Sequence, residues 1–394
     1  MKILFYRYGS ICENDVIEQF IALGLEVDTI EEEIGSKKLA ASDRVTLVAD
    51  KLNLAEYLFV FSINFFPSIS DVCEIYKVVY LGWSVDSPVT ELFSKSILND
   101  CNRIFLFDKK QYEDLHHFNP NCIFHLPLGT NVSRWDAVTS QITFEDRVRY
   151  SGDIAFVGSL YSEKDPYLNV QNPSDYLQGF MDSLYLVQKN LLGYTLSENA
   201  LTGKVVDELK EKDSIIFVDS TNYIKDMDAY CASHQIIDTH LSSLERIEII
   251  QTLARHFNVD LYTRSDTSVF NSCPGLRCKG GASTHVEMPK VFHLSKINLN
   301  MTIHSIEKGI PLRVWDIMGC GGFLLTNFQE ELSDYLIAGT DYDSFSCIDE
   351  LIDKCDFYLK NDSIREQIAR TGYEKTKNYH TYANRMPDMF KKLL

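Results

Sequence analysis

Short apolar runs that alternate with helical or polar stretches are the feature that most constrains the fold of this chain. Leu58–Phe61 and Ile104–Phe107 are each uninterrupted apolar runs. Such runs are typical of strands buried on both faces, as in a parallel sheet that helices cover. A helix is predicted from about Asn14 to Leu23, between the first two strands, and it ends at Gly24. This alternation predicts a doubly wound α/β domain.

The strand–helix pattern occurs twice along the chain. Six strands are expected in the first half, at 2–8, 27–32, 57–63, 77–81, 103–107 and 122–126. The pattern restarts with a strand at 154–158, after a charged stretch at 145–152, and further strands are expected at 215–218, 259–263, 295–302 and 323–326. The prediction is two tandem Rossmann-like doubly wound domains, residues 1–150 and 151–375, with a C-terminal helix at 376–394. Ligands of such sheets bind at the carboxyl ends of strands, so a site is expected in the cleft between the domains.

Two helical regions are expected outside the strands. Residues 174–212 are predicted to be mostly helical, with a stripe of apolar residues that we expect to be buried as core. The stripe consists of Leu177, Phe180, Met181, Leu184, Val187 and Leu191. The tail, 348–394, reads as wholly helical, and Pro387 is expected to kink or split its last helix.

Charge and composition exclude several classes of protein. The chain has 394 residues, with 38 Lys and Arg against 56 Asp and Glu, which gives a formal net charge of −18. A surface this acidic repels nucleic-acid backbones, so nucleic acid is not expected as a partner. Hydrophobic residues make up 45% and charged residues 24%, as in ordinary globular proteins rather than disordered ones.

Neither a membrane segment nor a metal site is expected. No stretch approaches the ~20 apolar residues that a membrane span needs, and the first residues lack the pattern of a signal peptide, so we expect a cytoplasmic protein without an integral membrane segment. The 10 cysteines follow no framework, and the spacing of Cys273 and Cys278 does not fit a zinc knuckle. Reduced thiols in the cytosol are the expected state.

The stretch 287–327 carries the most chemical information. After its predicted strand comes a loop with Gly309 and Pro311, and then a helix from about Leu312 to Met318. The start of this helix offers free backbone N–H groups to an anion, and Arg313 can add a bidentate phosphate contact. Asp316 follows one turn later. The pattern suits a diphosphate with a sugar hydroxyl beyond it, and an ordinary surface pair of Arg313 with Asp316 is the alternative.

This stretch resembles the C-terminal domain of the CgeB-like (spore maturation protein) glycosyltransferases, which have the GT-B architecture. The matching segments there are PKVFHLSKINLN, GIPLRVWDIMGCGGFLLTN and the Glu330-Glu331-Leu332 that follows. Elsewhere WSVDSP at 83–88, IFLFD at 104–108, LPLGTN at 126–131 and IAFVGSLY at 154–161 match as well. The resemblance covers nearly the whole chain.

The resemblance implies a hexosyltransferase that uses a nucleotide-diphospho-sugar donor, most simply UDP-linked. It makes 1–150 the acceptor domain and 151–375 the donor domain, with the helix at 376–394 returning to the first. Asp316 would bind the donor ribose or sugar, and Arg313 would contact the diphosphate beside Gly309 and Pro311. No metal and no cofactor besides the donor is required, because GT-B enzymes hold the diphosphate with a helix dipole and basic side chains.

The resemblance also proposes secondary donor contacts. Lys164, Lys290 and Lys296 are basic residues expected near the diphosphate, although Lys164 also fits a plain charged turn. Arg264 follows the strand expected near the nucleobase. Acidic and amide side chains after the strand at 323–326 are further candidates, with solvated loop residues as the alternative; these are Asn327, Glu330 and Glu331.

Asp86 is the candidate general base in the first domain. It follows the fourth predicted strand and precedes Ser87-Pro88, so it either deprotonates an acceptor hydroxyl or simply caps the next helix. The acceptor is left open among a glycan, a protein and a small molecule, as in cell-surface glycan synthesis or protein glycosylation. A nucleotide-sugar epimerase of the same fold and a non-catalytic binding subunit are the rival hypotheses.

Overall fold

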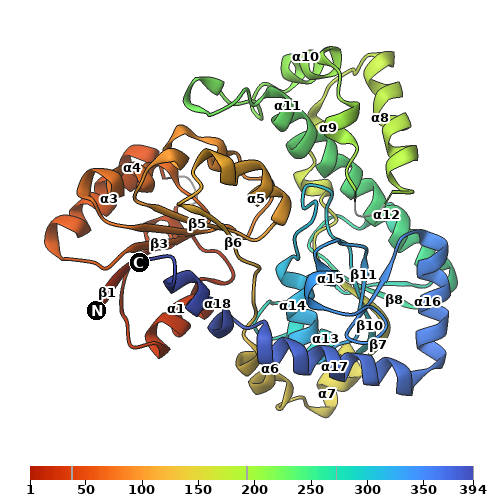
Figure 1. The fold of residues 1–394 in the computed structure, drawn as a ribbon. Coiled ribbons are helices and arrows are strands. Elements are labelled where there is room, and N and C mark those ends of the chain that lie inside the picture. Colours follow the sequence, from red (N-terminus) through yellow and green to blue (C-terminus); the bar gives the residue numbers. More distant parts are fainter. Residues whose placement is uncertain (37–38, 192–193, 272, 394) are drawn as a thin grey trace. The chain divides into compact units, whose positions relative to one another are not determined.

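The computed structural model describes residues 1–36, 39–191, 194–271 and 273–393 (Figure 1). The chain divides into two compact units. Unit 1 consists of Met1–Thr130, Asp219–Lys225 and His380–Leu394, and unit 2 of Asn131–Val218 and Asp226–Tyr379. No helix within the described ranges is long and apolar enough to cross a membrane.

Unit 1 is built on a six-stranded parallel sheet of strand order β2-β1-β3-β4-β5-β6. All six predicted strands are confirmed: β1 (Lys2–Tyr6), β2 (Glu26–Ile30), β3 (Val60–Ile63), β4 (Tyr80–Trp83), β5 (Asn102–Leu106) and β6 (Ile123–His125). β3 and β4 are buried at every position, as the apolar runs predict. The helices are α1 (Glu13–Ala22), α2 (Glu32–Gly35), α3 (Ala41–Leu54), α4 (Pro67–Tyr76) and α5 (Lys109–Leu115), with 3-10 turns at Thr90–Phe93, Lys95–Leu98 and His116–Phe118.

The last helix of the chain, α18 (Tyr382–Phe390), also belongs to unit 1. Thr381 caps it in a capping box with Asn384. The Tyr382 ring packs edge-on against Trp83 at 5.9 Å between centroids, and Arg385 Nε donates to the Leu128 carbonyl at 3.1 Å. The tail is helical as predicted, but its helices separate at His380–Thr381 and not at Pro387, which lies inside α18.

Unit 2 is built on a second six-stranded parallel sheet, of order β12-β11-β10-β7-β8-β9. Numbered along the chain, this is the Rossmann order 6-5-4-1-2-3, whose switch point lies between its first and fourth strands. The strands are β7 (Gly152–Val157), β8 (Val259–Tyr262), β9 (Leu276–Cys278), β10 (Ser295–Asn300), β11 (Leu324–Asn327) and β12 (Asp343–Phe345). One core cluster joins alternating residues of β7, β8, β10 and β11, which lie on one face of the sheet, to α12 and α16.

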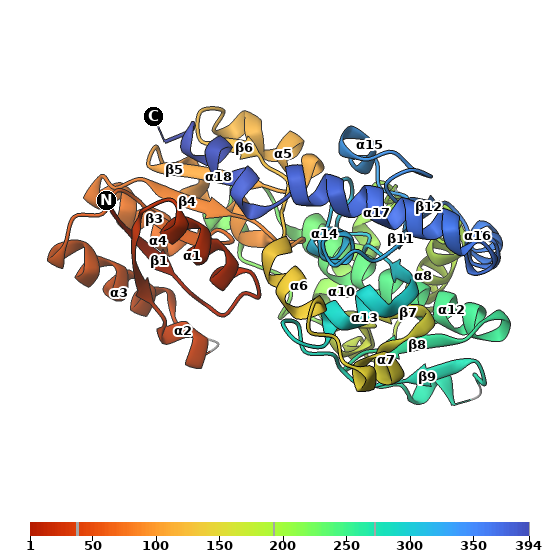
Figure 2. The same cartoon turned by 90° about the horizontal axis from the view of Figure 1, so that it is seen from below.

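The helices of unit 2 cover its sheet and form a long insertion between β7 and β8. They are α6 (Val132–Thr139), α7 (Phe144–Tyr150), α8 (Asp175–Gln188), α9 (Ser197–Ala200), α10 (Gly203–Lys212), α11 (Asp228–Tyr230), α12 (Asp238–His256), α13 (Met288–Leu294), α14 (Leu312–Gly319), α15 (Leu332–Tyr335), α16 (Ile348–Lys360) and α17 (Asp362–Tyr379). Short 3-10 turns of unit 2 lie at Ser162–Lys164, Pro166–Asn169 and Ser268–Phe270, and a π-helical segment, Cys231–Ile237, leads into α12. A further 3-10 turn, Ser220–Asn222, lies in the segment of unit 1 that interrupts this part of the chain. α17 packs along α14 (Figure 2).

Three sequence expectations need correction. Residues 215–218 form turn and coil, because the chain leaves unit 2 just after them instead of joining its sheet. The short edge strands β9 and β12, each of three residues, were not predicted, because their runs are too short to show a period. Unit 1 ends at Thr130 rather than at 150, since α6 and α7 pack on α13 of unit 2.

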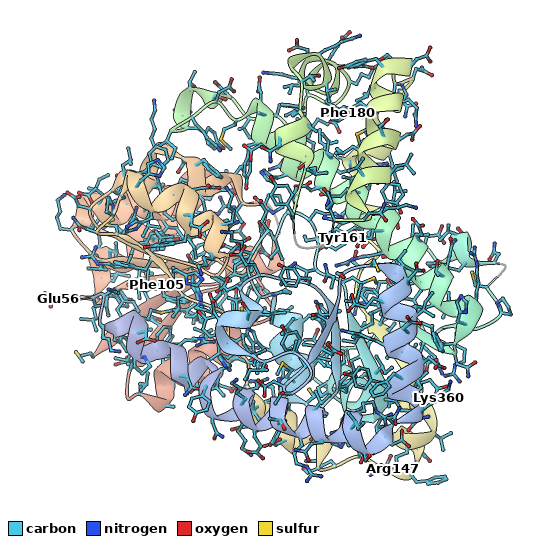
Figure 3. The ribbon with its side chains drawn as sticks, turned by 45° about the vertical axis from the view of Figure 1, so that its right-hand side comes forward. Glu56, Phe105, Arg147, Tyr161, Phe180 and Lys360 are labelled. Carbon is cyan, nitrogen blue, oxygen red and sulfur yellow. The ribbon has the colours of Figure 1, made fainter. Side chains whose placement is uncertain are left out.

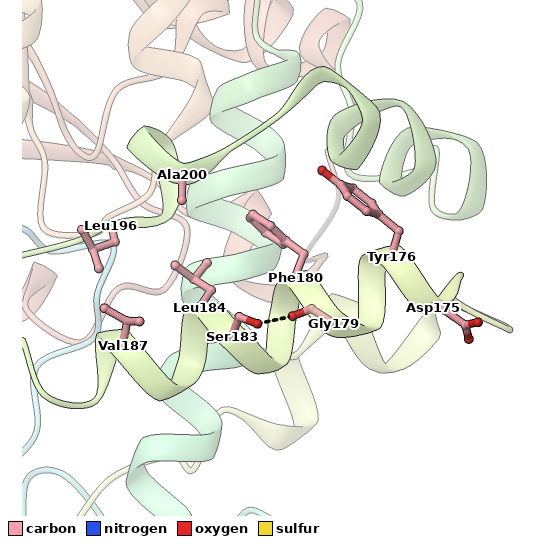
Figure 4. A pocket seen from close by; sticks show the side chains of 9 residues that line it. All are labelled: Asp175, Tyr176, Gly179, Phe180, Ser183, Leu184, Val187, Leu196 and Ala200. Carbon is pink, nitrogen blue, oxygen red and sulfur yellow. Dashed lines mark hydrogen bonds between the residues drawn. The ribbon is translucent and has the colours of Figure 1, made fainter.

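The apolar stripe of α8 is buried over only part of its length. Leu177, Met181 and Leu184 lie in a core with α10 and the π-helical segment, as predicted. Val187 is 52% exposed and Leu191 41% exposed. The outer part of the stripe borders an open groove of about 620 Å³ between α8 and α9 (Figure 4). The second half of the stripe was therefore wrongly assigned to the core.

Candidate active site

A cavity of about 180 Å³ lies at the switch point of the unit 2 sheet. It is lined by residues that follow β7, by residues that follow β10, by the start of α14 and by Arg246 of α12. This is where open α/β sheets bind their ligands, because the connections of the two central strands diverge there and leave a crevice.

Arg246 is the central cation of this cavity. Its side chain is 9% exposed, and its guanidinium donates to the Ser159 carbonyl at 2.6 Å and to the Met301 carbonyl. The guanidinium also lies 4.6 Å from the centroid of the Tyr161 ring. Burial lowers the pKa of Arg246 from its usual value. The two carbonyl bonds fix the cation between the loops that follow β7 and β10.

Arg313 supplies a second cation from the first turn of α14. Its guanidinium lies 5.3 Å from the Phe292 ring centroid, and Nη1 contacts the sulfur of Met288. Burial lowers its pKa, an effect that the negative charge of Asp316 opposes. Pro311 is the N-cap of α14 and lines the cavity beside it. The first turn therefore adds backbone N–H groups and a positive dipole to the two guanidinium groups.

The two cations of the cavity attract an anion. The hydrogen bonds of both guanidinium groups within the described part of the chain go to carbonyl oxygens or sulfur and not to a carboxylate. The charge of Arg313 also contributes to the lowered pKa of Arg246, so the two cations are close enough to repel each other. Buried like charges are costly, and an anion that bridges them offsets this cost with charge-assisted hydrogen bonds. A diphosphate suits this geometry.

The loop after β7 forms the opposite wall. Ser159 Oγ donates to Glu163 Oε1 at 2.6 Å and accepts from the Tyr161 amide at 2.8 Å. Tyr161 (Figure 3) has a φ of +66°, in the left-handed region that non-glycine residues rarely adopt. Lys164 lies near the cavity without lining it, with Nζ 5.4 Å from the Tyr161 ring centroid.

Lys290 and Lys296 are engaged away from the cavity. Lys290 Nζ forms an ion pair with Asp146 of α7 at 2.9 Å. Lys296 lies at the amino end of β10 and pairs with Asp153 at 2.9 Å, while the cavity lies past the carboxyl end of the same strand. Neither position supports the predicted diphosphate contact, because both ammonium groups already have carboxylate partners outside the cavity.

The candidates after β8 and β11 have different placements. Asn327 is 4% exposed, and its amide holds the backbone of Thr302 through Oδ1 at 2.8 Å and Nδ2 at 3.2 Å. It thus positions a cavity residue rather than facing the cavity. Glu330 is exposed, with Lys308 3.8 Å away, whereas Glu331 is 1% exposed. Arg264 is exposed at the carboxyl end of β8, where its side chain covers Gly281.

Asp316 and Gly309 are buried close to the cavity but are not among the residues that line it. Asp316 is 7% exposed and lies one turn after Arg313 on α14. Of the predicted donor residues, the structure therefore brings Pro311 and Arg313 to the cavity itself, with Asp316 and Lys164 beside it.

Arg246 is the cavity residue that sequence reasoning missed. Ile249, Ile250 and Leu253 follow it at positions i+3, i+4 and i+7, and all three are buried. An arginine on the apolar face of a helix is a recognisable signal, because an unpaired charge in a core is rarely tolerated without a function.

Asp86 belongs to a polar cluster in unit 1. Asn64 follows β3 with a φ of +58°, and its Nδ2 donates to Asp86 Oδ2 at 2.6 Å and to Tyr8 Oη at 2.8 Å. The Val85 amide donates to Asn64 Oδ1 at 2.9 Å. The cluster lies at the carboxyl ends of β1, β3 and β4, next to the switch point of the unit 1 sheet between β1 and β3. Asp86 is exposed there, as a general base must be.

The loop after β1 is already filled by a carboxylate of the chain. Glu13 is 1% exposed, and its Oε1 accepts from the amides of Tyr8, Gly9 and Ser10 at 2.9–3.0 Å. These amides would otherwise form an anion site. Because Glu13 occupies them, this loop has no place for a phosphate or carboxylate of a ligand.

The comparisons with known proteins agree with this architecture. Residues 246–391 match a family model described as glycosyl transferase-like. Sucrose-phosphate synthase from Thermosynechococcus elongatus superimposes with a TM-score of 0.60 at 10% identity, over 100% of this chain and 99% of that one. HepE from Anabaena in complex with UDP gives 0.55 at 10%, over 100% of both chains. A glycosyltransferase from Rickettsia africae ESF-5 gives 0.51 at 10%, over 100% and 98%.

These likenesses establish the fold. The chain has the two-domain GT-B fold of glycosyltransferases, with one Rossmann-like sheet in each unit. No curated protein matches the chain significantly, and the narrower resemblance to CgeB-like proteins stays a prediction. Within the described residues, no group of three or more His, Cys, Asp or Glu side chains is arranged to hold a metal ion.

Proposed function

We propose that the protein is a glycosyltransferase that moves a hexose from a UDP-sugar to an acceptor hydroxyl. The observation that carries this proposal is the pair of buried guanidinium groups, Arg246 and Arg313, at the switch point of unit 2, beside the start of α14. A nucleoside diphosphate matches their positive charge, and its phosphate oxygens can accept hydrogen bonds from both groups. UDP is the preferred nucleotide because HepE, which shares the fold, is known in complexes with UDP and with UDP-glucose.

In the proposed reaction, an acceptor oxygen forms a bond to the anomeric carbon of the donor. The bond from that carbon to the diphosphate oxygen breaks, and UDP leaves with the electron pair. The two arginines and the start of α14 stabilise the charge that develops on the diphosphate. Asp86 takes the proton of the acceptor hydroxyl, and the amide of Asn64 orients its carboxylate. Asp316 is proposed to bind a donor hydroxyl.

A panel of nucleotide-sugars tests the proposal. UDP-glucose, UDP-galactose, UDP-N-acetylglucosamine, GDP-mannose and ADP-glucose are added singly, and the melting temperature and the products are measured. At least one UDP-sugar is expected to stabilise the protein, by about 2.7 kcal/mol at 100 times its Kd, and to be hydrolysed slowly to UDP and free sugar. Stabilisation by none of the five would refute the proposal.

Variants on one helix sharpen this test. Arg246→Lys is expected to lose most of the stabilisation by UDP-sugar, because an ammonium group cannot bridge two loops and a phosphate as a guanidinium does. Arg255→Lys on the last turn of the same helix serves as the matched control, since Arg255 is exposed and lies outside the cavity. Conversion of the donor to its epimer without acceptor would favour the epimerase instead.

A further inference from the structure

A second polar cavity, of about 560 Å³, lies in unit 1. Its walls come from the start of α4, from the segment that joins the two 3-10 turns after β4, and from Asp219–Lys225. We call Asp219–Lys225 the strap. The polar residues of the wall are Ser68, Asp71, Ser94, Lys95, Ser96, Asn99, Asn222 and Tyr223. A cavity of this size holds a small molecule or one part of a larger ligand.

The strap is a fixed wall of this cavity. The Ile224 amide donates to the Phe93 carbonyl at 2.8 Å, and Lys95 Nζ donates to the Thr221 carbonyl at 2.7 Å. Tyr223 forms an antiparallel β-bridge with Ser94. The neighbouring parts of the chain on both sides of the strap belong to unit 2. The long insertion of unit 2 thus sends one segment into unit 1, where it completes a cavity.

Ser94 is a buried part of this wall. Its residue is 7% exposed, and its hydroxyl has no hydrogen-bond partner among the residues that the structure describes. Because that oxygen is covered, the polar groups that meet a ligand come from the other lining residues.

The charges at the cavity favour an uncharged ligand. Asp71 and Lys95 are the two charged residues among those that line it, and they carry opposite signs. Asp71 Oδ1 accepts from Asn99 Nδ2 at 2.9 Å, and Lys95 is bound to the strap. The nearby loop after β1 is likewise filled by Glu13. Unit 1 therefore offers hydrogen bonds rather than net positive charge, unlike the arginine cavity of unit 2.

The chemistry of the wall matches a sugar. Hydroxyl, amide and carboxylate groups are the donors and acceptors that satisfy the many hydroxyls of a sugar ring. Tyr223 adds an aromatic ring, which offers an apolar face together with a polar end. The polar wall therefore favours a ligand with many hydroxyl groups, and an anion would meet Asp71.

The cavity is connected through the chain to the candidate base. α4 begins at Pro67, three residues after Asn64, and the turn Thr90–Phe93 begins four residues after Asp86. The wall formed by α4 therefore follows β3 along the chain, and the wall formed by the 3-10 turns follows β4. The carboxyl ends of the same two strands carry the Asp86 cluster. A ligand of several sugar units could reach from one to the other.

We propose that this cavity binds a neutral sugar residue of the acceptor, so that the acceptor is a carbohydrate. The inference rests on the proposed glycosyltransferase function and names its acceptor class. The strap residues Asn222 and Tyr223 are specificity residues for that sugar.

Saturation-transfer NMR on the full chain tests the inference with maltose, cellobiose, lactose and N,N′-diacetylchitobiose. At least one disaccharide is expected to bind. Asn222→Ala and Tyr223→Ala are expected to weaken its binding about 10-fold, the effect of losing about 1.4 kcal/mol. Glu91→Gln is the control, since Glu91 is exposed in the adjoining turn and does not line the cavity. If Tyr223→Ala disturbs the strap, the test depends on Asn222→Ala alone, because the Asn222 side chain is exposed.

Titration of UDP into the same samples separates the two proposals. Protein that binds UDP but none of the four disaccharides overturns the inference and leaves the proposed function intact. Disaccharide binding that is unchanged in both strap variants also overturns it. Protein that binds a disaccharide through the strap but not UDP contradicts the proposed function and supports the sugar cavity.

Discussion

At the scale of residues, the positive charge of the unit 2 cavity comes from Arg246 and Arg313. The sequence pointed to Lys164, Lys290 and Lys296, but two of these lysines pair with Asp146 and Asp153 outside the cavity. Arg313, which the sequence also proposed, lines the cavity from the first turn of α14. The apolar helix face around Arg246 is visible in the sequence, but its place in the cavity is not, because its partners, the carbonyls of Ser159 and Met301, are far away in sequence.

A substitution of Asp316 tests whether this carboxylate binds the ribose hydroxyls of the donor. Asp316→Asn is expected to weaken UDP binding about 10-fold, because the amide is a poorer acceptor for ribose hydroxyls than a carboxylate. Binding of inorganic pyrophosphate should be unchanged, since pyrophosphate carries no hydroxyl. Calorimetric titration of both ligands measures the two effects.

An equal loss of both ligands would contradict this role and show that Asp316 acts through Arg313, whose pKa its charge raises. Asp334→Asn in the neighbouring helix α15 is the control, because Asp334 is exposed and lies outside the cavity.

At the scale of elements, the strands of the first sheet were predictable because each is an apolar run, and β9 and β12 were not because they are short and lie at sheet edges. For the apolar stripe of α8, the sequence predicted more burial than the structure shows. Its helical period is clear in the sequence, but period alone does not tell how far a covering element extends, and Val187 is left exposed.

The packing of α18 on unit 1 depends on a glycine. A Cβ atom on Gly129 would lie 2.8 Å from the carbonyl carbon of Thr381 and 2.9 Å from the Tyr382 nitrogen, both backbone atoms. Gly129→Ala is therefore expected to lower the free energy of unfolding by about 1–3 kcal/mol, as overpacking does.

Gly179→Ala is the matched control for this prediction, because Gly179 lies inside α8 and a Cβ there meets no atom within 4 Å. It should raise stability by about 0.5–1 kcal/mol through its helix propensity. Urea unfolding measures both variants, and equal effects of the two substitutions would disprove the contact.

The π-helical segment before α12 gives a pH-dependent stability. Burial lowers the pKa of His234, but hydrogen bonds to Asp238 and Glu198 outweigh burial and raise it to about 10, against 6.5 ordinarily. Because the folded state holds the proton more tightly, this contribution is complete below about pH 6.5 and is lost as the pH rises to about 10.

His234→Gln is therefore expected to reduce stability at pH 6 and to flatten its decline between pH 6.5 and 10. Chemical unfolding at a series of pH values measures the slope. His256→Gln, at an exposed position at the end of α12, should leave the slope as in the unsubstituted protein. An unchanged slope in His234→Gln would show that the ion pair does not contribute.

At the scale of the whole molecule, a protein of formal charge −18 has to bind an anionic diphosphate. The fold concentrates positive charge at one place, because the parallel sheet of unit 2 brings the start of α14 and an arginine of α12 to one switch point. The tandem α/β plan was predictable from alternation alone. The strap was not, because its few polar residues show no pattern and their place is set by contacts with Phe93 and Lys95.

The most direct test of the central claim is a calorimetric titration of UDP into the protein, into two cavity variants and into one control variant. We predict that the unsubstituted protein binds UDP, that Arg246→Lys and Arg313→Lys each weaken binding by about 10-fold or more, and that Arg255→Lys binds as the unsubstituted protein does. Undetectable binding of UDP, or binding that both arginine substitutions leave unchanged, would contradict the claim that this cavity holds the donor.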